Sequence, residues 1–365
     1  MGLACGIVGL PNVGKSTLFN ALTLSEESAR SDYMFSTTEP VRGTVVVPDP
    51  RLQHIADLIP THKVVPAQMT IVDIPGLVSG SSQGEGMGIG FLGAIKESDV
   101  LLHVVRCFVK EGVQHVSGSI DPAIDAEIVE LEILAADQQT VDRNVDRVSK
   151  KARTGDKESV ALQELLLRAK ACLDGGKPLR MGEWSERDRA LLKPLFLMTI
   201  KPVLFVANVG DDDLEGTSAN VVALQEYAAR TNAKCMHLCA DIEAELARMS
   251  DDDRTVFMGD LGLKEQGLVR LTHAGFDLLG LQTFFTAGEK ETRAWVIHKG
   301  DTAPLGAGVI HTDFIKKFIR AEVYSYEDLV ALKTEAAIKS AGKMRLEGKE
   351  YVLRDGDVCH FLIGN

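Results

Sequence analysis

The sequence contains no apolar run that approaches the roughly 20 residues needed to cross a bilayer, so we expect no membrane-spanning segment. Its six cysteines are scattered without a C-x-x-C pair, which argues against a zinc site and favours reduced thiols. It also lacks an excess of positive charge, because its formal net charge is −12. That charge argues against a protein that coats nucleic acid generally, although it allows a local basic patch. The first residues lead directly into an apolar strand, so we expect no signal peptide and a cytoplasmic location.

The rest of the composition is that of an ordinary soluble globular protein. The chain has 365 residues, of which 45% are hydrophobic and 25% charged. A chain of this length is expected to form two or three domains.

Residues 9–17 read GLPNVGKST and match G-x-x-x-x-G-K-[ST], the phosphate-binding loop. An apolar strand at residues 3–8 precedes the loop, and a helix start at residues 17–22 follows it. The glycines let backbone N–H groups turn toward phosphate oxygens, and the positive end of the helix adds to the attraction. Lys15 would reach the β- and γ-phosphates, and the Ser16 hydroxyl would complete a Mg²⁺ shell. The nucleotide-binding residues predicted in this loop are Asn12, Val13, Gly14, Lys15, Ser16 and Thr17.

A polar stretch at residues 25–38 predicts an exposed loop, which ends in the sequence FSTTEP. In nucleotide switches, a threonine in such a loop contacts Mg²⁺ and the γ-phosphate, and the loop orders only when that phosphate is present. Threonine is also common at the ends of ordinary loops, because its hydroxyl can hydrogen-bond to the backbone of a turn. The position before the next motif favours the switch role, for which Thr37 and Thr38 compete, and we choose Thr37.

An apolar strand at residues 68–72 ends in DIPG at residues 73–76, a D-x-x-G motif. Asp73 would hold Mg²⁺ through water, and the Gly76 N–H would contact the γ-phosphate. Many GTPases place a glutamine after this glycine to orient the attacking water, but here the residue is Leu77. Leucine neither donates nor accepts a hydrogen bond, so another group must position the water or hydrolysis is slow.

Residues 80–90 read GSSQGEGMGIG, with five glycines, and predict either a loop that closes over the phosphates or a plain surface loop. His103 lies inside the apolar strand at residues 99–107 and is expected to be a packed core residue. His115 lies in the polar loop at residues 110–121. It is a candidate for positioning the attacking water, and the alternative is a solvated loop histidine.

The next strand, at residues 202–207, is followed by Asn208-Val209-Gly210-Asp211, where nucleotide switch proteins carry N-K-x-D. Asp211 is in place to accept hydrogen bonds from guanine, but Val209 replaces the lysine that covers the base. Cys239 and Ala240 match the S-A-[KL] loop whose backbone touches the base, with cysteine for serine. Base preference therefore depends on where Asp211 points.

Residues 124–172 predict a helical hairpin inserted in the nucleotide domain. Apolar residues recur there at helical spacing, namely Ile124, Ile128, Leu131, Leu134, Ala135, Val141, Val145 and Val148. The sequence TGD at residues 154–156 breaks the pattern, and a second helix follows at residues 160–172. The dense charge of alternating sign favours a projecting arm for a partner, although internal bracing is a close alternative.

From about residue 281 the chain reads as a separate module. It predicts a short helix at residues 307–314, strands at residues 291–297, 318–325 and 358–363, and a hairpin at residues 345–352. Its basic residues include Lys299, Lys316, Lys317, Arg320, Lys343, Arg345 and Lys349. They form either a face that meets RNA or ordinary solvated charge.

Several segments together resemble the Obg-related YchF-type ATPases (Obg-like ATPases): GLPNVGKST, FSTTEP, DIPGLV, GEGMG, HVVRCF, LQTFFTAG and HTDFIKKFIRAEV. The resemblance covers essentially the whole chain. It implies a Ras-like P-loop domain, an inserted α-helical coiled coil and a C-terminal TGS domain of β-grasp type. It also implies ATP hydrolysis preferred over GTP, a hydrophobic residue in place of the catalytic glutamine, and association with the ribosome.

The family's base-reading motif usually reads N-x-x-E, so Asn208 matches it and Asp211 departs from it. We still expect ATP to be preferred, because the missing lysine weakens guanine recognition more than Asp211 restores it.

Three domains follow from this interpretation: a nucleotide domain at residues 1–123 and 198–280, a helical domain at residues 124–197 and a TGS domain at residues 281–365. We expect a monomeric, Mg²⁺-dependent ATPase that acts as a ribosome-associated switch. The alternatives are a GTP-specific translational GTPase and a nucleotide-gated RNA- or ribosome-binding module with negligible hydrolysis. The predicted catalytic residues are Lys15, Gly76 and His115, and the predicted metal ligands are Ser16, Thr37 and Asp73.

Overall fold

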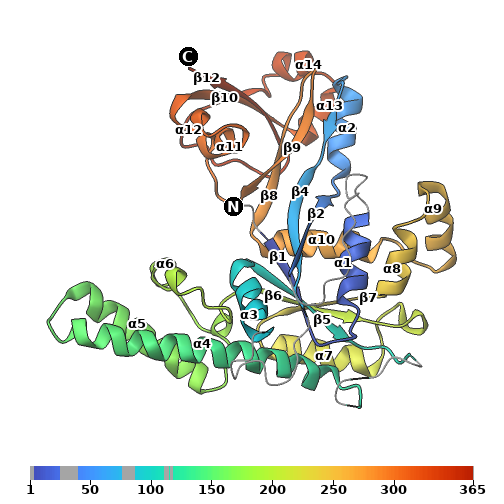
Figure 1. Ribbon diagram of the computed structural model, residues 1–365. Coiled ribbons are helices and arrows are strands. Elements are labelled where there is room, and N and C mark those ends of the chain that lie inside the picture. The colour runs from blue at the N-terminus through green and yellow to red at the C-terminus, as the bar shows by residue number, and fades with distance from the viewer. Residues whose placement is uncertain (1–3, 25–39, 76–86, 111–114, 116–117, 365) are drawn as a thin grey trace. The chain divides into compact units, whose positions relative to one another are not determined.

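The computed structural model in Figure 1 describes residues 4–24, 40–75, 87–110, 115 and 118–364. The chain divides into two compact units. Residues 1–44 and 70–271 form the first, and residues 45–69 and 272–365 form the second. Residues 45–69 thus group with the C-terminal residues, which the sequence pattern did not indicate. No helix in the described part of the chain is long and apolar enough to cross a membrane.

A six-stranded sheet carries the predicted nucleotide motifs, with its strands in the order β2, β4, β1, β5, β6 and β7 (Figure 1). In that order they span Val41–Val47, Ala67–Asp73, Ala4–Val8, Val100–Arg106, Val203–Asn208 and Lys234–Leu238. Neighbours from β4 to β7 are parallel. Strands β1, β5 and β6 are buried along their whole length. Parallel strands covered on both faces need apolar side chains on both, which explains their almost continuous apolar sequences.

Helices connect the strands of this sheet. Helices α1 (Lys15–Leu24), α3 (Met87–Glu97) and α7 (Ala219–Arg230) lie between strands, whereas α8 (Ala240–Leu246), α9 (Asp251–Asp260) and α10 (Gly267–Leu278) follow the last strand, β7. Helix α1 packs against α8, and α7 packs against β6 and β7. Because the carboxyl ends of parallel strands meet at one edge, the loops after β1, β4, β5, β6 and β7 lie along the same edge.

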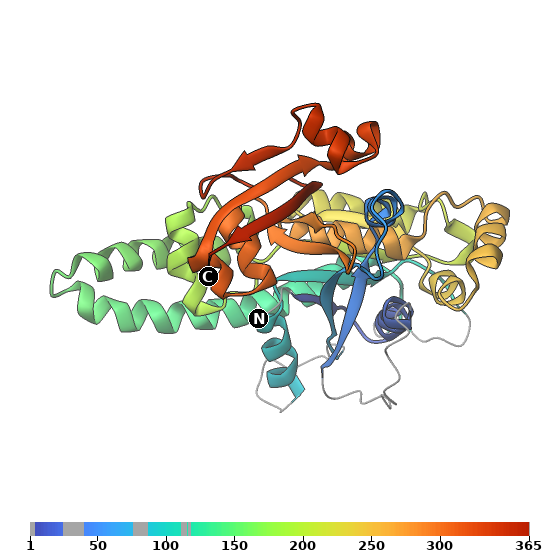
Figure 2. The ribbon, with the colours of Figure 1, turned by 90° about the horizontal axis from the view of Figure 1, so that it is seen from above.

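Two long helices, α4 (Pro122–Ala152) and α5 (Lys157–Asp174), run antiparallel and side by side in both views (Figures 1 and 2). Asp121 caps the start of α4 by accepting a backbone N–H, and Pro122 follows at the first helical position. Asp156 caps α5 in the same way. The predicted helical hairpin is therefore confirmed, and its 31-residue first helix is about 46 Å long.

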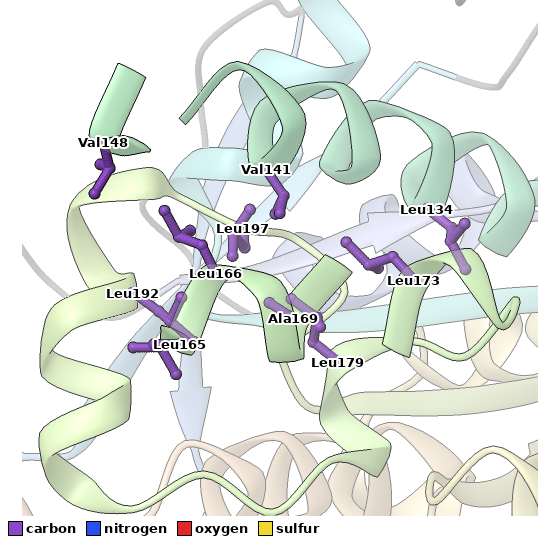
Figure 3. Packing of buried hydrophobic residues seen from close by; sticks show 10 residues of the cluster. All are labelled: Leu134, Val141, Val148, Leu165, Leu166, Ala169, Leu173, Leu179, Leu192 and Leu197. Carbon is purple, nitrogen blue, oxygen red and sulfur yellow. The ribbon is translucent and has the colours of Figure 1, made fainter. Parts of the chain in front are cut away.

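The hairpin closes over a row of buried aliphatic side chains (Figure 3). They are Leu134, Val141, Val148, Leu165, Leu166, Ala169, Leu173, Leu179, Leu192 and Leu197. The last three come from the segment that returns from α5 to β6, so this segment contributes to the hairpin's core. Its short elements are η2 (Leu179–Met181), α6 (Glu186–Leu192) and η3 (Lys193–Leu195).

Asp137 fixes α4 to the chain just before β6. Its carboxylate accepts from the N–H groups of Met198 and Thr199 at 2.9 and 2.7 Å, and from the Thr199 hydroxyl at 2.7 Å. Burial raises the pKa of Asp137, and these hydrogen bonds oppose the shift. The hairpin is thus attached to the sheet as well as packed within itself.

Over the first three turns of α4, the prediction of which residues form the buried face is wrong. Ile124, Ile128 and Leu131 are 52%, 38% and 50% exposed. Ala126, Val129 and Ile133 are buried instead, on the side of α4 that packs against β5 and α7. This part of α4 is apolar on both sides, so periodicity alone selected the side with the larger residues.

A second six-stranded sheet has the order β11, β10, β12, β8, β9 and β3. Its strands span, in that order, Arg345–Glu347, Phe318–Ser325, Asp357–Ile363, Leu281–Thr286, Thr292–His298 and Val64–Val65. The pairs β12–β8 and β3–β9 are parallel and the others antiparallel. This mixed sheet with its covering helix agrees with the expected β-grasp architecture.

Helix α11 (Ala303–Ile310) covers this sheet, with Ala303 and Ala307 in a core that includes Phe284 and Phe318. The predicted helix at residues 307–314 is wrong in its bounds, because α11 ends before His311 and α12 (Asp313–Lys317) begins anew. The predicted hairpin at residues 345–352 is also shorter, since β11 ends at Glu347 and Val352 forms only an isolated bridge with Thr302.

The remaining helices of this unit are α2 (Pro50–Leu58), α13 (Tyr326–Leu332) and α14 (Glu335–Ser340). Arg51 of α2 explains why residues 45–69 belong here. Its guanidinium pairs with Asp49 and, at 2.7 Å, with Asp355, and it lies over the Phe285 ring. His54 is 2.8 Å from the Tyr326 hydroxyl.

Candidate functional site

The loop between β1 and α1 depends on two glycines. Gly9 and Gly14 have φ angles of +150° and +99°, a region that L side chains rarely adopt. A Cβ on Gly9 would collide with the Val104 carbonyl oxygen, and a Cβ on Gly14 would collide with the Asn208 side chain. Both glycines of the motif are therefore required by the backbone and by close neighbours.

Lys15 is the first residue of α1, and its side chain turns back across the loop. Its Nζ donates to the Leu10 carbonyl oxygen at 2.7 Å. Burial lowers the pKa of Lys15 to about 8, and the Asp73 carboxylate partly opposes this shift. An ammonium group and the N-terminal N–H groups of a helix thus meet in one loop, a combination that attracts phosphate.

Ser16 and Asp73 come together as the sequence predicts. The Ser16 hydroxyl donates to Asp73 Oδ2 at 2.9 Å. The pairing of β1 with β4 places Ile7 opposite Asp73, so the end of β4 lies beside the start of the loop. Burial raises the pKa of Asp73, and the Ser16 hydrogen bond and Lys15 oppose that shift.

The same two residues fit a small divalent cation. Asp73 Oδ1 is buried, and no group in the described part of the chain forms a hydrogen bond with it. A buried carboxylate oxygen without a donor is costly unless a cation, or a water that the cation holds, satisfies it. Hydroxyl and carboxylate oxygens are the ligands that Mg²⁺ prefers, usually completed by substrate phosphates and water.

Part of the predicted site lies outside the described residues. This applies to Thr37, Gly76, Leu77 and most of the glycine-rich stretch at residues 80–90. The switch threonine, the γ-phosphate contact and the loop closure therefore stay predictions.

Asn208, at the end of β6, joins two of the predicted nucleotide loops. Its Nδ2 donates to the Val13 carbonyl oxygen, and its Oδ1 accepts from the Ala240 N–H, both at 2.9 Å. Val209 is buried, and its N–H donates to the Leu238 carbonyl oxygen. The Asn208 side chain is therefore occupied in holding the phosphate loop against the loop after β7.

Asp211 lies beside this junction with its carboxylate exposed, at the start of η4 (Asp211–Asp213). Cys239 is the N-cap residue of α8, and burial raises the pKa of its thiol. A pair that the sequence pattern did not indicate lies nearby, where Lys110 Nζ donates to Asp241 Oδ2 at 2.7 Å. No motif joins these two residues, which are 131 positions apart, so only the fold reveals them.

The two histidines have different surroundings. His103 is buried in β5 against the Phe205 ring, as expected, and burial lowers its pKa to about 3. His115 is also buried, which contradicts the alternative of a solvated loop histidine. Its Nε2 lies 2.8 Å from Asp125 Oδ2, and the two side chains are 6% and 2% exposed. Asp125, in the first turn of α4, carried no sequence signal for this role.

Comparison with known proteins agrees with the geometry. A family model described as 50S ribosome-binding GTPase matches residues 4–144, and the model YchF-GTPase_C, described as a protein of unknown function, matches residues 281–364. The "Ribosome-binding ATPase YchF" of Bacillus subtilis (strain 168) is 48% identical over 364 residues, covering 99% of each chain. The protein of the same name from Escherichia coli O157:H7 is 46% identical over 362 residues, again covering 99% of each.

A solved structure gives the same result for the fold. The YchF GTPase of Schizosaccharomyces pombe is 33% identical, with a TM-score of 0.88, over 99% of this chain and 98% of that one. Identity at these levels over nearly the whole length is enough to assign the family. The chain belongs to the YchF family.

Proposed function

We propose that this protein is a ribosome-associated nucleotide hydrolase that prefers ATP to GTP and works in the cytoplasm as a monomer. The observation that carries the proposal is the Ser16–Asp73 pair beside the Lys15 loop, because it joins a phosphate cradle to a cation site. The relatives named "Ribosome-binding ATPase YchF" support both the hydrolysis and the partner.

In this proposal the Ser16 hydroxyl, Thr37 and, through water, the Asp73 carboxylate would hold Mg²⁺. When bound, the metal neutralises charge on the phosphates. Lys15 adds a cation at the same phosphates, and its lowered pKa reflects burial that the phosphate charge would offset. The Gly76 N–H is proposed to contact the γ-phosphate.

The adenine preference rests on what the base loop lacks. Val209 stands where a lysine would cover guanine, and the Asn208 amide is already bonded to Val13 and Ala240. The backbone at Cys239 and Ala240 is left to line the base. The competing proposal, a GTPase, rests on the exposed Asp211 carboxylate, which has the chemistry to accept from guanine N1–H and N2–H₂.

Titration calorimetry with ADP and GDP at matched Mg²⁺ separates the two. The expected result is that ADP binds about tenfold tighter or more. Asp211→Ala should leave this ratio unchanged, as should Asp212→Ala, a matched change at the neighbouring exposed aspartate. If GDP binds more tightly and only Asp211→Ala removes that preference, Asp211 reads guanine and the GTPase proposal replaces ours.

His115 is our proposed water-positioning residue, because Leu77 has no group for that purpose. The Asp125 carboxylate holds one imidazole nitrogen, which fixes the ring's tautomer and orientation.

ATP turnover measured with and without ribosomes tests the hydrolase itself. We expect measurable turnover that ribosomes change, because the helical hairpin and the C-terminal unit are proposed to respond to the nucleotide state. Turnover near zero in both conditions would support the nucleotide-gated binding module instead.

A further inference from the structure

Three large apolar side chains form an exposed row on α4. Ile124, Ile128 and Leu131 are 52%, 38% and 50% exposed, and their spacing of four and three residues puts them on one face. We call this row the α4 stripe. It lies opposite the buried Ala126 and Val129, so it does not belong to the packing of α4 on the sheet. Single exposed apolar residues are ordinary on a folded protein, whereas a contiguous row of them is a feature of interaction sites.

Carboxylates flank the α4 stripe on both sides. Glu127 is exposed along one edge and Glu132 lies along the other, half-buried. Glu132 Oε1 is buried and has no hydrogen-bond partner within the described residues, so only the rest of this carboxylate is open to a partner. From Pro122 to Asp142, α4 has no Lys or Arg. Of its six acidic residues, Asp125 and Asp137 are buried, and Glu130 and Asp142 pair with Arg180 and Lys170, so Glu127 and Glu132 are the carboxylates left beside the stripe. This charge distribution favours a basic partner.

A cavity of about 240 Å³ lies beside the stripe, between α4 and α7. Leu131 and Glu127 line it from α4, and Tyr227 lines it from α7. Glu130 and Arg180 in its wall already pair with each other at 2.7 Å, and the Tyr227 hydroxyl donates to Glu130 at 3.3 Å. Because Glu130 already pairs with Arg180 and Tyr227, a side chain that enters the cavity meets no unpaired charge from these three residues.

We propose that the α4 stripe is the docking surface for a basic amphipathic helix of a partner protein. The partner's apolar ridge packs along Ile124, Ile128 and Leu131, and one ridge side chain enters the cavity beside Leu131. Lys or Arg side chains on its two flanks face Glu127 and Glu132. Docking at the α4 stripe is separate from the nucleotide cycle and does not depend on it.

The charges argue against the other classes of partner. RNA would bring its phosphates against the carboxylates of this face, which repel them. Helices that lie on membranes carry basic residues beside their apolar face, whereas this face is acidic. A protein helix with basic flanks satisfies both the apolar row and the carboxylates.

The test uses a fluorescein-labelled helical peptide of about 18 residues, with Leu at i, i+3, i+4 and i+7 and Lys on both flanks. A second peptide carries Glu in place of Lys. Fluorescence anisotropy with the full-length protein should show binding of the Lys peptide that weakens with salt, and about tenfold weaker binding of the Glu peptide.

The double variant Ile128→Ser/Leu131→Ser should lose about tenfold or more of the affinity for the Lys peptide. Its matched control is Leu167→Ser on α5, because Leu167 is 48% exposed and lies outside the stripe. The control should bind within about twofold of the wild type. Both proteins should keep wild-type ATP turnover, so a docking defect is separable from a failure of the proposed hydrolase.

Three results would overturn the proposal. Unchanged binding by the double variant, or an equal loss in Leu167→Ser, shows that the peptide binds elsewhere. Equal binding of the Lys and Glu peptides shows that the flanking carboxylates do not select the partner. A large fall in melting temperature of the double variant shows that the stripe is covered within the folded protein, since exposed side chains contribute little to stability.

Discussion

Replacing Asp137 by alanine is expected to detach α4 from the chain before β6. The carboxylate is the acceptor for the N–H groups of Met198 and Thr199 and for the Thr199 hydroxyl. Asp137 and Thr199 are 1% and 4% exposed, so water does not replace a lost acceptor without local opening. Alanine therefore leaves two buried backbone donors unpaired.

The size of the effect follows from those two donors. A buried donor left without a partner costs about 1–3 kcal/mol, so two cost about 2–6 kcal/mol. Alanine also removes a desolvated carboxylate, whose raised pKa shows that burial disfavours its charge. We therefore expect a net loss of about 2–4 kcal/mol in the free energy of unfolding. Asp137→Asn keeps one acceptor oxygen and should lose about half as much.

The assay can be confined to the hairpin. The sequence has two tryptophans, and Trp184 packs against the hairpin's buried cluster. In a Trp295→Phe background, the Trp184 fluorescence in urea reports the unfolding of this region. Asp142→Ala is the matched control, because Asp142 is exposed and its ion pair with Lys170 lies at the surface, where solvent screens it. If Asp137→Ala unfolds at the same urea concentration as Asp142→Ala, the hydrogen bonds of Asp137 do not hold α4 to the chain before β6.

Three further predictions concern the site and the core. His115→Ala should slow ATP hydrolysis about tenfold or more without weakening nucleotide binding, and unchanged turnover would remove His115 from the mechanism. Ser16→Ala should reduce the dependence of nucleotide affinity on Mg²⁺, measured by titration with and without the metal; an undiminished dependence would contradict the cation site. Burial lowers the pKa of His103 to about 3, whereas the ordinary value is 6.5. Between these two pKa values His103 is protonated in the unfolded chain but not in the folded one. The wild type should therefore lose stability as the pH falls below about 6.5, and His103→Leu should lose less. Parallel stability profiles of the two proteins against pH would contradict this.

The phosphate loop and its cation pair could be predicted from the sequence because their geometry is local. The glycines and Lys15 lie within nine residues between a strand and a helix. Asp73 is distant in sequence, but it ends a strand parallel to β1, and the ends of parallel strands meet at one edge. The motif and the strand pattern are therefore enough to predict that Ser16 and Asp73 lie close together.

The rest depends on contacts that no motif encodes. His115 pairs with Asp125 because α4 enters beside β5, and the sequence does not specify that entry. The buried side of α4 was missed because Ala126 and Val129 are smaller than the exposed isoleucines on the other side. Residues 45–69 group with the C-terminal unit through pairs such as Arg51–Asp355, which are about 300 residues apart and invisible to periodicity.

The order of charges along α4 affects how the protein meets a polyanion. After six acidic residues with no base, the last ten residues of the helix carry four basic residues and one acidic residue. The acidic and basic residues lie toward opposite ends of a helix that is about 46 Å long. The field of a polyanion therefore exerts a torque on the helix, which turns its basic end toward the polyanion before any contact forms. Since the Debye length is about 10 Å at 0.1 M salt, this orientation weakens quickly as salt is added. Neutralising the basic residues should therefore lower the rate of association more than it raises the rate of dissociation.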